Sequence, residues 1–405
     1  MIQNNLGDFI PKNLQQIINL KWLGQYGNLN QQIGEWKALW ENKPILAGGR
    51  YNDNGHKEGP WNELFCNYSE IDQLIESGIY QEGIRVGKWV TSKLLYICQT
   101  QYGKMSIGEG MYDDQGRKVG KWVDLHPQFS KDFLLVFEGD YIENVKNGYW
   151  STKFKYFSEN KYTIIGGGTY ENGVKHGHWI DLSEYFNNRV QYLEEGNYDK
   201  GLKKGYWTIQ QKKVPGYFLS IILQFPKMVY DKNGKKQGAW IEISKFTRTF
   251  GNSFLYSKGW YLDDVKDGYW EIIFMIDGVN FKRGGGKYQN GKKVGKWKEF
   301  EQQNDLFWRV QIGDYKEGNK YGFWESRKIK RYLPNQPYRF EQTLKKQDPI
   351  RVFGMFNENG LEEGHWCYVK ESKEYEDCSQ LKIELKNGII DKKYEKDIKE
   401  FLDII

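Results

Sequence analysis

Gly168-Thr-Tyr170-Glu-Asn-Gly173-Val-Lys-His-Gly177-His-Trp179 is the clearest copy of a motif that recurs along the chain and decides its fold. In twelve copies an aromatic residue precedes a Gly-x-Trp triplet by seven or eight residues, and it is Tyr in all but the last copy, which has Phe356. Successive motif Trp residues are mostly 27 to 33 positions apart, which is the period of a repeat array rather than of one globule. Twelve of the 16 Trp residues occupy this position: Trp36, Trp61, Trp89, Trp122, Trp150, Trp179, Trp207, Trp240, Trp270, Trp297, Trp324 and Trp366.

Each copy has the pattern of a β-hairpin. In Gly-x-Tyr and in Gly-x-Trp the glycine shares a strand face with the aromatic that follows it, because side chains alternate with period two. A glycine weakens a strand unless an aromatic ring from the neighbouring strand lies across it. We expect the motif glycines to have this role, so that a Gly177→Val replacement would displace a stacked ring.

The residues between Tyr and the second glycine predict tight turns. Six of the twelve copies have Asn-Gly or Gln-Gly there, which tolerates positive φ. Two copies lack that glycine and have Asn144 or Asp264, the side chain types that best tolerate the left-handed region. Tyr and Gly are eight apart, not seven, in the copies ending at Trp36, Trp61, Trp122, Trp240 and Trp366, which indicates a bulge at the tip. Hairpins in series predict an all-β chain that forms an antiparallel meander.

The motif resembles the MORN repeat family, and most closely its short variant with the pattern Tyr-x-x-Gly-Lys-x-x-Gly-x-Trp. The resemblance covers roughly residues 24 to 366. It implies an elongated, twisted β-meander of tandem hairpins. It also implies a scaffold in a cytoskeletal, ciliary or axonemal assembly, where MORN-like proteins recur, and it allows phospholipid binding, which some MORN proteins show.

Both ends differ from the array. We divide the chain into an N-terminal helical cap (1–23), a single repeat domain (24–370) and a C-terminal degenerate repeat with a capping helix (371–405). Helical spacing is present from Pro11 to Leu23 in Leu14, Ile17 and Ile18, and from Lys392 onward in Tyr394, Ile398, Leu402 and Ile405. The favoured interpretation is that these helices cover open sheet edges, and the alternative is that one docks a partner.

Composition and charge argue against several classes of protein. The net charge of +6 over 405 residues is too small for a nucleic-acid footprint, and the aromatic content of 17% indicates a core of stacked rings. The amino end lacks a secretion signal, and no run reaches the roughly 18 apolar residues of a membrane span. The four Cys residues show neither metal nor disulfide spacing: Cys66, Cys98, Cys367 and Cys378. We expect a cytoplasmic protein.

A basic residue stands two positions after the turn residue in ten consecutive copies. This basic ladder consists of Lys57, Arg85, Lys118, Lys146, Lys175, Lys203, Lys236, Lys266, Lys293 and Lys320. One interpretation is a cationic surface for phosphoinositides, tubulin tails or another acidic partner. The interpretation that we favour is structural, with the lysine stems over the rings, the ammonium groups in water, and cross-strand pairs to acids at the turns, such as Glu82 and Glu171.

Aromatic residues also occupy the position between Gly and Trp, in every second copy from the middle of the chain onward: Tyr149, Tyr206, Tyr269 and Phe323. That position faces away from Trp. Either the long segments between hairpins fold over these rings, which we slightly favour, or a partner protein does.

No catalytic constellation is evident. His176 and His178 would share a strand face, but no further ligand is obliged to join them. The glycine triplets at 166–168 and 284–286 lack the strand-to-helix setting of a phosphate loop. We therefore expect no catalytic residue, metal, cofactor or small-molecule substrate. The predicted function is a non-catalytic scaffold that binds other proteins, and the alternative is a peripheral membrane protein that binds acidic phospholipid through the basic ladder.

Overall fold

The computed structural model describes residues 14–98, 101–127, 129–130, 133–155, 161–184, 186, 192–211, 227–244, 253–276, 279–302, 307–330, 350–357, 359–370, 379–386 and 389–390. The chain divides into two compact units. The first consists of Met1–Leu182 with Asn197–Leu202, and the second of Ser183–Gly196 with Lys203–Ile405.

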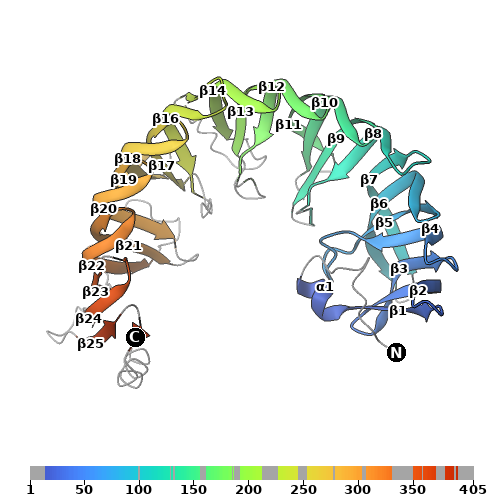
Figure 1. Cartoon of the computed structure of the whole chain (residues 1–405), viewed down its shortest axis with the longest axis horizontal. Coiled ribbons are helices and arrows are strands. Elements are labelled where there is room, and N and C mark those ends of the chain that lie inside the picture. The colour runs from blue at the N-terminus through green and yellow to red at the C-terminus, as the bar shows by residue number, and fades with distance from the viewer. Residues whose placement is uncertain are drawn as a thin grey trace. The chain divides into compact units, whose positions relative to one another are not determined.

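The first unit is an antiparallel meander in which each strand pairs with the next along the chain (Figure 1). One short helix precedes it, α1 (Leu14–Asn19). The strands are β1 (Leu20–Tyr26), β2 (Gln32–Trp40), β3 (Lys43–Tyr51), β4 (Lys57–Leu64), β5 (Leu74–Gln81), β6 (Ile84–Cys98), β7 (Gln101–Tyr112), β8 (Lys118–Leu125), β9 (Leu134–Ile142), β10 (Val145–Lys155), β11 (Thr163–Glu171) and β12 (Val174–Leu182). Strand β13 (Tyr192–Asp199) has residues in both units.

The second unit repeats this arrangement, again with consecutive antiparallel pairs. Its strands are β14 (Leu202–Gln211), β15 (Met228–Tyr230), β16 (Lys236–Ile243), β17 (Ser253–Leu262), β18 (Val265–Ile276), β19 (Val279–Gln289), β20 (Lys292–Gln302), β21 (Phe307–Lys316), β22 (Asn319–Lys330), β23 (Ile350–Phe356), β24 (Glu362–Lys370), β25 (Ser379–Lys386) and β26 (Ile389–Ile390). The predicted all-β meander of hairpins is confirmed.

The hairpin tips have the predicted turn chemistry in both lengths. In seven-residue copies two successive residues have positive φ, as at Asn172 (49°) and Gly173 (80°), which is the two-residue turn that suits twisted strands. Asn144 and Asp264 have φ of 70° and 68°, as expected for the glycine substitutes. Their side chains also accept the backbone N–H of Lys118 and Lys236 at 2.7 Å, a bond that glycine could not make.

The eight-residue copies form a different tip. The side chain of Asp113 accepts the N–H groups of Gln115 and Arg117 at 3.0 and 2.8 Å, and Gly116, with φ 76°, closes the turn onto the Asp113 carbonyl. The extra residue therefore forms a turn with a glycine bulge, and the register beyond it is kept.

The glycine before Tyr, not the glycine before Trp, lies under the ring. A Cβ on Gly168 would lie 2.3 Å from the ring of Trp179, whereas a Cβ on Gly177 would meet nothing within 4 Å. The expectation that Gly177→Val displaces a stacked ring is therefore wrong in its cause.

Gly177 has a backbone role instead, with φ of 68°. Gly168 pairs with Trp179 and Thr169 with His176, so Gly177 and His178 form a bulge that shifts the register. The Thr169 carbonyl accepts the indole N–H of Trp179 at 3.1 Å. The glycine before Trp thus provides a left-handed bulge, and the bulge places the indole over Gly168.

Further apolar clusters form where the strands end away from the hairpin tips. In the first unit Tyr68 packs with Trp40 and Ile75, and Phe129 packs with Leu74 and Val136. In the second unit Trp308 packs with Leu255, Phe274, Phe300 and Val310. The described connections therefore bury their rings at the strand ends.

The N-terminal helix is shorter than expected and packs through a polar residue. Its apolar side chains Leu14, Ile17 and Ile18 are exposed, while Gln16 is buried and its amide donates to carbonyls of the loop after β4, including that of Phe65 at 3.3 Å. Within the described ranges, no helix has the length and hydropathy of a membrane span. The helix predicted from Lys392 onward lies outside the described residues. In the segment 371–405 the described residues are those of β25 and β26.

Candidate functional site

Each unit stacks its motif rings into one continuous series on one face of the sheet, called here the stack face. In the first unit the series runs from Tyr26 to Tyr198, with centroids 4.9 to 6.2 Å apart and rings edge to face. In the second it runs from Trp207 to Phe356 in the same geometry. The eleven motif Trp residues from Trp36 to Trp324 are buried. Edge-to-face pairs add roughly 0.5–1.5 kcal/mol each beyond burial, so the stack is the main stabilising feature of each unit.

The basic ladder lies on this stack. Each cation is positioned over the Trp of its own copy and the aromatic ring of the next copy. The charged atom is 3.9 to 4.9 Å from the Trp centroid and 4.8 to 5.8 Å from the next ring. These are cation–π distances, so the charged groups, and not only the stems, contact the rings.

Carboxylates that the sequence analysis did not assign neutralise the ladder. They come two positions after Trp in every second copy: Glu63, Asp124, Asp181, Glu242 and Glu299. Each accepts the hydroxyl of the following motif Tyr, as Asp124 does from Tyr141 at 2.8 Å. Each also pairs with one or two ladder cations. Two further acids on incoming strands complete the set, Glu76 with Arg85 and Glu194 with Lys203.

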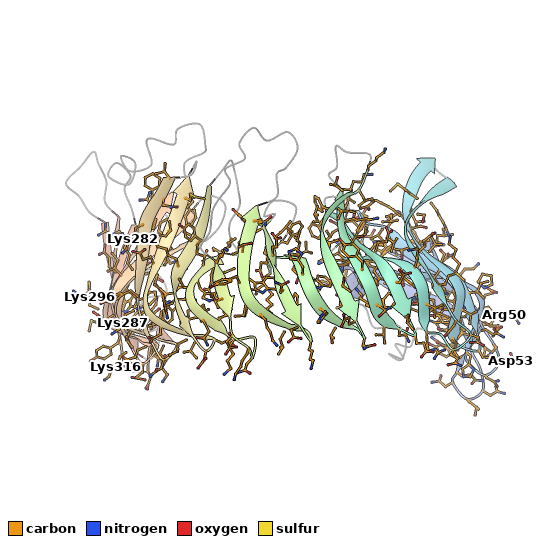
Figure 2. All side chains as sticks on the ribbon, turned by 90° about the horizontal axis from the view of Figure 1, so that it is seen from above. Arg50, Asp53, Lys282, Lys287, Lys296 and Lys316 are labelled. Carbon is orange, nitrogen blue, oxygen red and sulfur yellow. The ribbon has the colours of Figure 1, made fainter. Side chains whose placement is uncertain are left out.

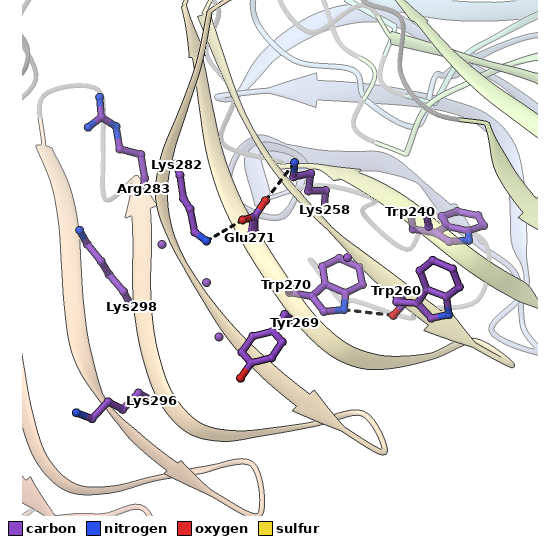
Figure 3. Close-up of a pocket in the computed structure, with 15 residues that line it drawn as sticks. Trp240, Lys258, Trp260, Tyr269, Trp270, Glu271, Lys282, Arg283, Lys296 and Lys298 are labelled. Carbon is purple, nitrogen blue, oxygen red and sulfur yellow. Dashed lines mark hydrogen bonds and ion pairs between the residues drawn. The ribbon is translucent and has the colours of Figure 1, made fainter.

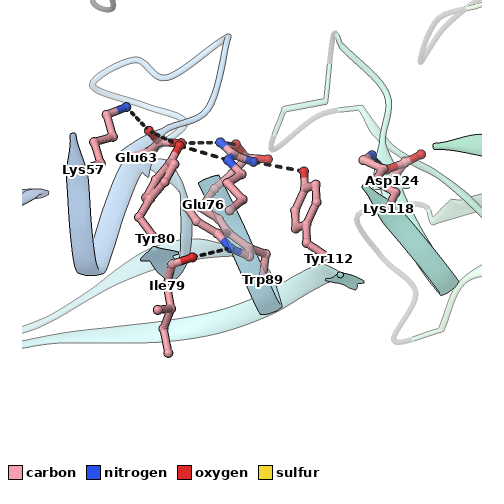
Figure 4. A network of polar contacts seen from close by, with 10 residues as sticks. Lys57, Glu63, Glu76, Ile79, Tyr80, Trp89, Tyr112, Lys118 and Asp124 are labelled. Atoms are coloured by element: carbon pink, nitrogen blue, oxygen red, sulfur yellow. Dashed lines mark hydrogen bonds and ion pairs between the residues drawn. The ribbon is translucent and has the colours of Figure 1, made fainter. Parts of the chain in front are cut away.

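Glu63 shows the arrangement at its fullest (Figure 4). Lys57 lies 2.6 Å from one oxygen of Glu63, Arg85 bonds the other, and Tyr80 donates its hydroxyl. Burial alone would raise the pKa of the Glu63 carboxyl, but Arg85 and Lys57 outweigh burial and lower the pKa below its usual value. For Glu299 the same balance holds, with Lys293 and Lys320 as the cations.

The acids at the turns have other partners than the expected ones. Glu82 lies 3.3 Å from His56, and Glu143 lies 3.1 Å from Arg117, which are the residues just before the ladder positions. The predicted pairing with the ladder is therefore wrong for Glu82 and Glu143. The signal that could have found the true partners is the acid two residues after Trp, which stands on the same strand face as the ring.

The structural interpretation of the ladder gains support, with one change. The ladder side chains that pair with acids are only 13 to 28% exposed, so their charged groups are largely covered rather than in water. An acidic surface would have to displace these carboxylates to reach them.

Lys146 and Lys236 are exceptions within the ladder, because no described carboxylate lies within ion-pair distance of either ammonium. The Lys146 ammonium contacts the rings of Trp150, Phe137 and Tyr170 at 3.9, 5.5 and 5.5 Å. Burial lowers the pKa of Lys146, and the neighbouring cation Lys118 lowers it further, against the opposing effect of Asp124.

This contrast predicts unequal costs for removing two neighbouring cations. Lys118→Met is expected to lower the free energy of unfolding by about 2 kcal/mol, because it leaves Asp124 partly buried without its ion pair. Lys146→Met is expected to cost less than about 1 kcal/mol, since no acid loses a partner and the thioether still packs on the rings. Urea unfolding of both variants measures this, and equal costs would contradict the assignment of Asp124 to Lys118.

The opposite face of each sheet, called here the open face, carries the second predicted series. Trp150 is 2% exposed and its neighbour Tyr149 is 60% exposed, as strand alternation requires. Tyr206, Tyr269 and Phe323 are 66, 78 and 57% exposed. The expectation that inter-hairpin segments cover these rings is therefore wrong for the described residues.

Other candidate chemistry is sparse. His176 lies 3.9 Å from Glu171 at its own turn. No group of three His, Cys, Asp or Glu side chains in the described ranges could hold a metal ion. Burial lowers the pKa of His126, which packs against Phe133.

No protein-family model matches this sequence, and no curated protein is significantly similar to it. The resemblance to MORN repeats rests on the motif residues alone.

Proposed function

We propose that this protein is a non-catalytic scaffold that holds other proteins along the open faces of its sheets. The observation that carries the proposal is the exposure of the four rings Tyr149, Tyr206, Tyr269 and Phe323. Large exposed aromatic side chains are costly in water and are characteristic of protein-binding surfaces. The three rings of the second unit, Tyr206, Tyr269 and Phe323, offer regularly spaced sites for one kind of partner.

The spacing follows from the strand order. In the second unit Tyr206, Tyr269 and Phe323 stand on β14, β18 and β22, each four strands from the next. At about 4.8 Å per strand, successive rings are separated by roughly 19 Å. The same copies lack an acid at the position two residues after Trp, so the two-copy period is present on both faces of the sheet.

The assembly is proposed from the motif. Its resemblance to MORN repeats favours a cytoskeletal or ciliary setting in the cytoplasm. Binding to acidic phospholipid through the basic ladder receives no support from the ladder's geometry, because its cations contact rings and carboxylates within the stack face.

The test is detergent extraction of cells that express the full chain. The wild type is expected in the insoluble pellet with the cytoskeleton. A variant with Tyr149, Tyr206, Tyr269 and Phe323 all changed to Ser is expected in the supernatant, with little loss of stability because the rings are exposed. The control changes exposed aliphatic residues at hairpin tips to Ser instead: Ile142, Leu202, Leu262 and Val265. A wild type that is fully extracted, or a folded aromatic variant that stays in the pellet, would reject the proposal.

A further inference from the structure

A hollow of about 970 Å³ opens on the second unit around the glycines at 284–286 of β19 (Figure 3). Side chains cannot fill it at two of these positions. A Cβ on Gly284 would lie 2.1 Å from the Lys298 carbonyl oxygen, and one on Gly285, with φ of 129°, would lie 2.1 Å from that of Trp270. The lining at these two positions is therefore bare backbone of β19, and the rest of the lining comes from β16, β17, β18 and β20. We call this hollow the cationic groove.

The side chains around the cationic groove are strongly unbalanced in charge. Five are basic, Lys258, Lys282, Arg283, Lys296 and Lys298, and one is acidic, Glu271. Lys258 and Lys282 lie 3.1 and 2.7 Å from Glu271 and share it.

On the other wall, Lys296 and Lys298 have no described carboxylate within ion-pair distance. Burial lowers the pKa of Lys298, and so do the cations Arg283 and Arg327. In Figure 2 the labelled residues Lys282, Lys296, Lys287 and Lys316 follow one another in that order toward the hairpin tips of this unit.

The first unit contains the same backbone feature without the five cations. Its glycines at 166–168 have the same close contacts, with a Cβ on Gly167 2.1 Å from the Trp150 carbonyl oxygen. Both registers shift at the equivalent point, between Thr152 and Lys153 and between Ile272 and Ile273.

The paired registers align the two surfaces residue by residue. Lys282 corresponds to Ile164, and Arg283 to Ile165. Lys298 corresponds to Ile180, and Lys258 to Glu138. The glycine bulge therefore does not require basic neighbours, so the cations of the second unit need an explanation other than folding.

We propose that the cationic groove binds an extended acidic segment of a partner protein. The proposal rests on the scaffold function and identifies the chemistry of one partner. The cations stand on β17, β19 and β20, a spread of three strand spacings or about 14 Å, which suits a row of separate carboxylates rather than one anionic group. An extended segment of about four residues, at roughly 3.4 Å per residue, is long enough to cross this spread. Trp260 and Tyr269, 54 and 78% exposed, supply apolar contact at the rim.

This choice of partner class follows from shape. A flat bilayer surface meets protruding groups, whereas part of this hollow is lined by the backbone of the glycines at 284–286. Lysine, which supplies four of the five cations, is a strongly hydrated point charge, whereas forked recognition of phosphate favours arginine. Lipid and nucleic acid are therefore outcomes to be tested, not the expected ligands.

Fluorescence anisotropy of the full chain with a labelled peptide of alternating Glu and Ala tests the proposal, with the Gln-Ala peptide as the neutral probe. Wild type is expected to bind the Glu peptide and not the Gln peptide. Lys282→Ile with Lys298→Ile, which installs the side chains of the first unit, is expected to weaken binding about tenfold or more. The matched control is Lys37→Ile with Lys43→Ile, an equal loss of exposed charge on the first unit, and it is expected to bind as wild type does.

Equal binding by the groove variant and wild type would overturn the proposal. The proposal would also be overturned if the groove variant lost more binding to phosphatidylserine vesicles or to oligothymidylate than to the Glu peptide. The scaffold proposal is judged separately by detergent extraction. A protein that stays in the pellet but ignores the peptide refutes only the groove, and one that binds the peptide but is fully extracted refutes only the scaffold.

Discussion

Gly168→Ala is expected to destabilise the first unit more than any other single-methyl change in its motif, by about 3 kcal/mol or more. The added Cβ would lie 2.3 Å from the Trp179 ring, so the ring must leave the strand or the strands must separate. Overpacking of this kind costs about 1–3 kcal/mol, and the lost contacts of Trp179 with Tyr170 and Tyr198 add to it.

Gly177→Ala is the matched control, because it adds the same methyl group in the same hairpin. Nothing lies within 4 Å of its Cβ, and only the positive φ of 68° is unfavourable. Its expected cost is therefore about 1–2 kcal/mol. Gly177→Asn should recover part of that loss, since Asn tolerates the left-handed region, whereas Gly168→Asn should recover nothing.

Urea unfolding and near-ultraviolet circular dichroism separate the two causes. Gly168→Ala should lose the dichroism of the stacked indole in the folded baseline, and Gly177→Ala should keep it. If Gly177→Ala proves the more damaging change, or if both variants lose the indole signal equally, the assignment of the two glycines is wrong.

These glycines show which features local sequence can predict. Turn residues act within three or four positions, so Asn144 and Asp264 could be predicted as glycine substitutes from their own conformational preferences. Which motif glycine lies under a ring depends instead on the register between strands. Period-two reasoning places Gly177 and Trp179 on one face, but it does not include the bulge at Gly177 and His178 that shifts the strands.

The acid partners of the ladder were missed for a similar reason. Glu63 binds Lys57 of its own copy and Arg85 of the next, so the pairing crosses a copy boundary. Turn acids are closer in sequence, but the structure gives them partners beside the ladder position, as Arg117 before it for Glu143 and His176 after it for Glu171. The two-copy period of acids after Trp was present in the sequence, and it became interpretable only once the stack face was known.

The exposed rings show a third feature that the sequence alone does not predict. The sequence places Tyr149 opposite Trp150, and the structure confirms it, but a single chain does not state what covers an exposed ring. Length alone suggested that the inter-hairpin segments would, whereas the described ones place Tyr68 and Phe129 in clusters at the strand ends.

Raising the pH above about 10 is expected to unfold both units steeply, because buried tyrosines hold protons that the unfolded chain releases. Burial raises the pKa of Tyr170 and of Tyr288 to about 12. For Tyr141 and Tyr261 burial raises the pKa above its ordinary value as well, and the carboxylates of Asp124 and Glu242 raise it further. Burial and the Glu63 carboxylate also raise the pKa of Tyr80.

The sign follows from proton binding. A tyrosine whose folded pKa exceeds the unfolded value of about 10 binds more protons in the folded state above that pH, so stability is complete below pH 10 and falls as pH rises. Each such residue contributes a slope of about 1.4 kcal/mol per pH unit, and the five named here together give roughly 7 kcal/mol per pH unit, divided between the two units. Lys146 and Lys298, whose pKa values are lowered, act in the opposite direction, but they are two groups against the five tyrosines.

The measurement is the free energy of unfolding in urea at a series of pH values above neutrality, with tyrosinate absorbance followed in parallel. Tyrosines of the open face are exposed and do not report on the stack, so the relevant signal is the tyrosinate that a Tyr141→Phe variant lacks. That signal should appear together with the loss of β-sheet dichroism, not before it. Tyr141→Phe removes one titrating group and should reduce the slope of the first unit by about 1.4 kcal/mol per pH unit. If the tyrosinate signal assigned to Tyr141 forms near pH 10 while the sheet remains intact, the Tyr141 hydroxyl is accessible to water, and its pair with Asp124 is not formed in solution.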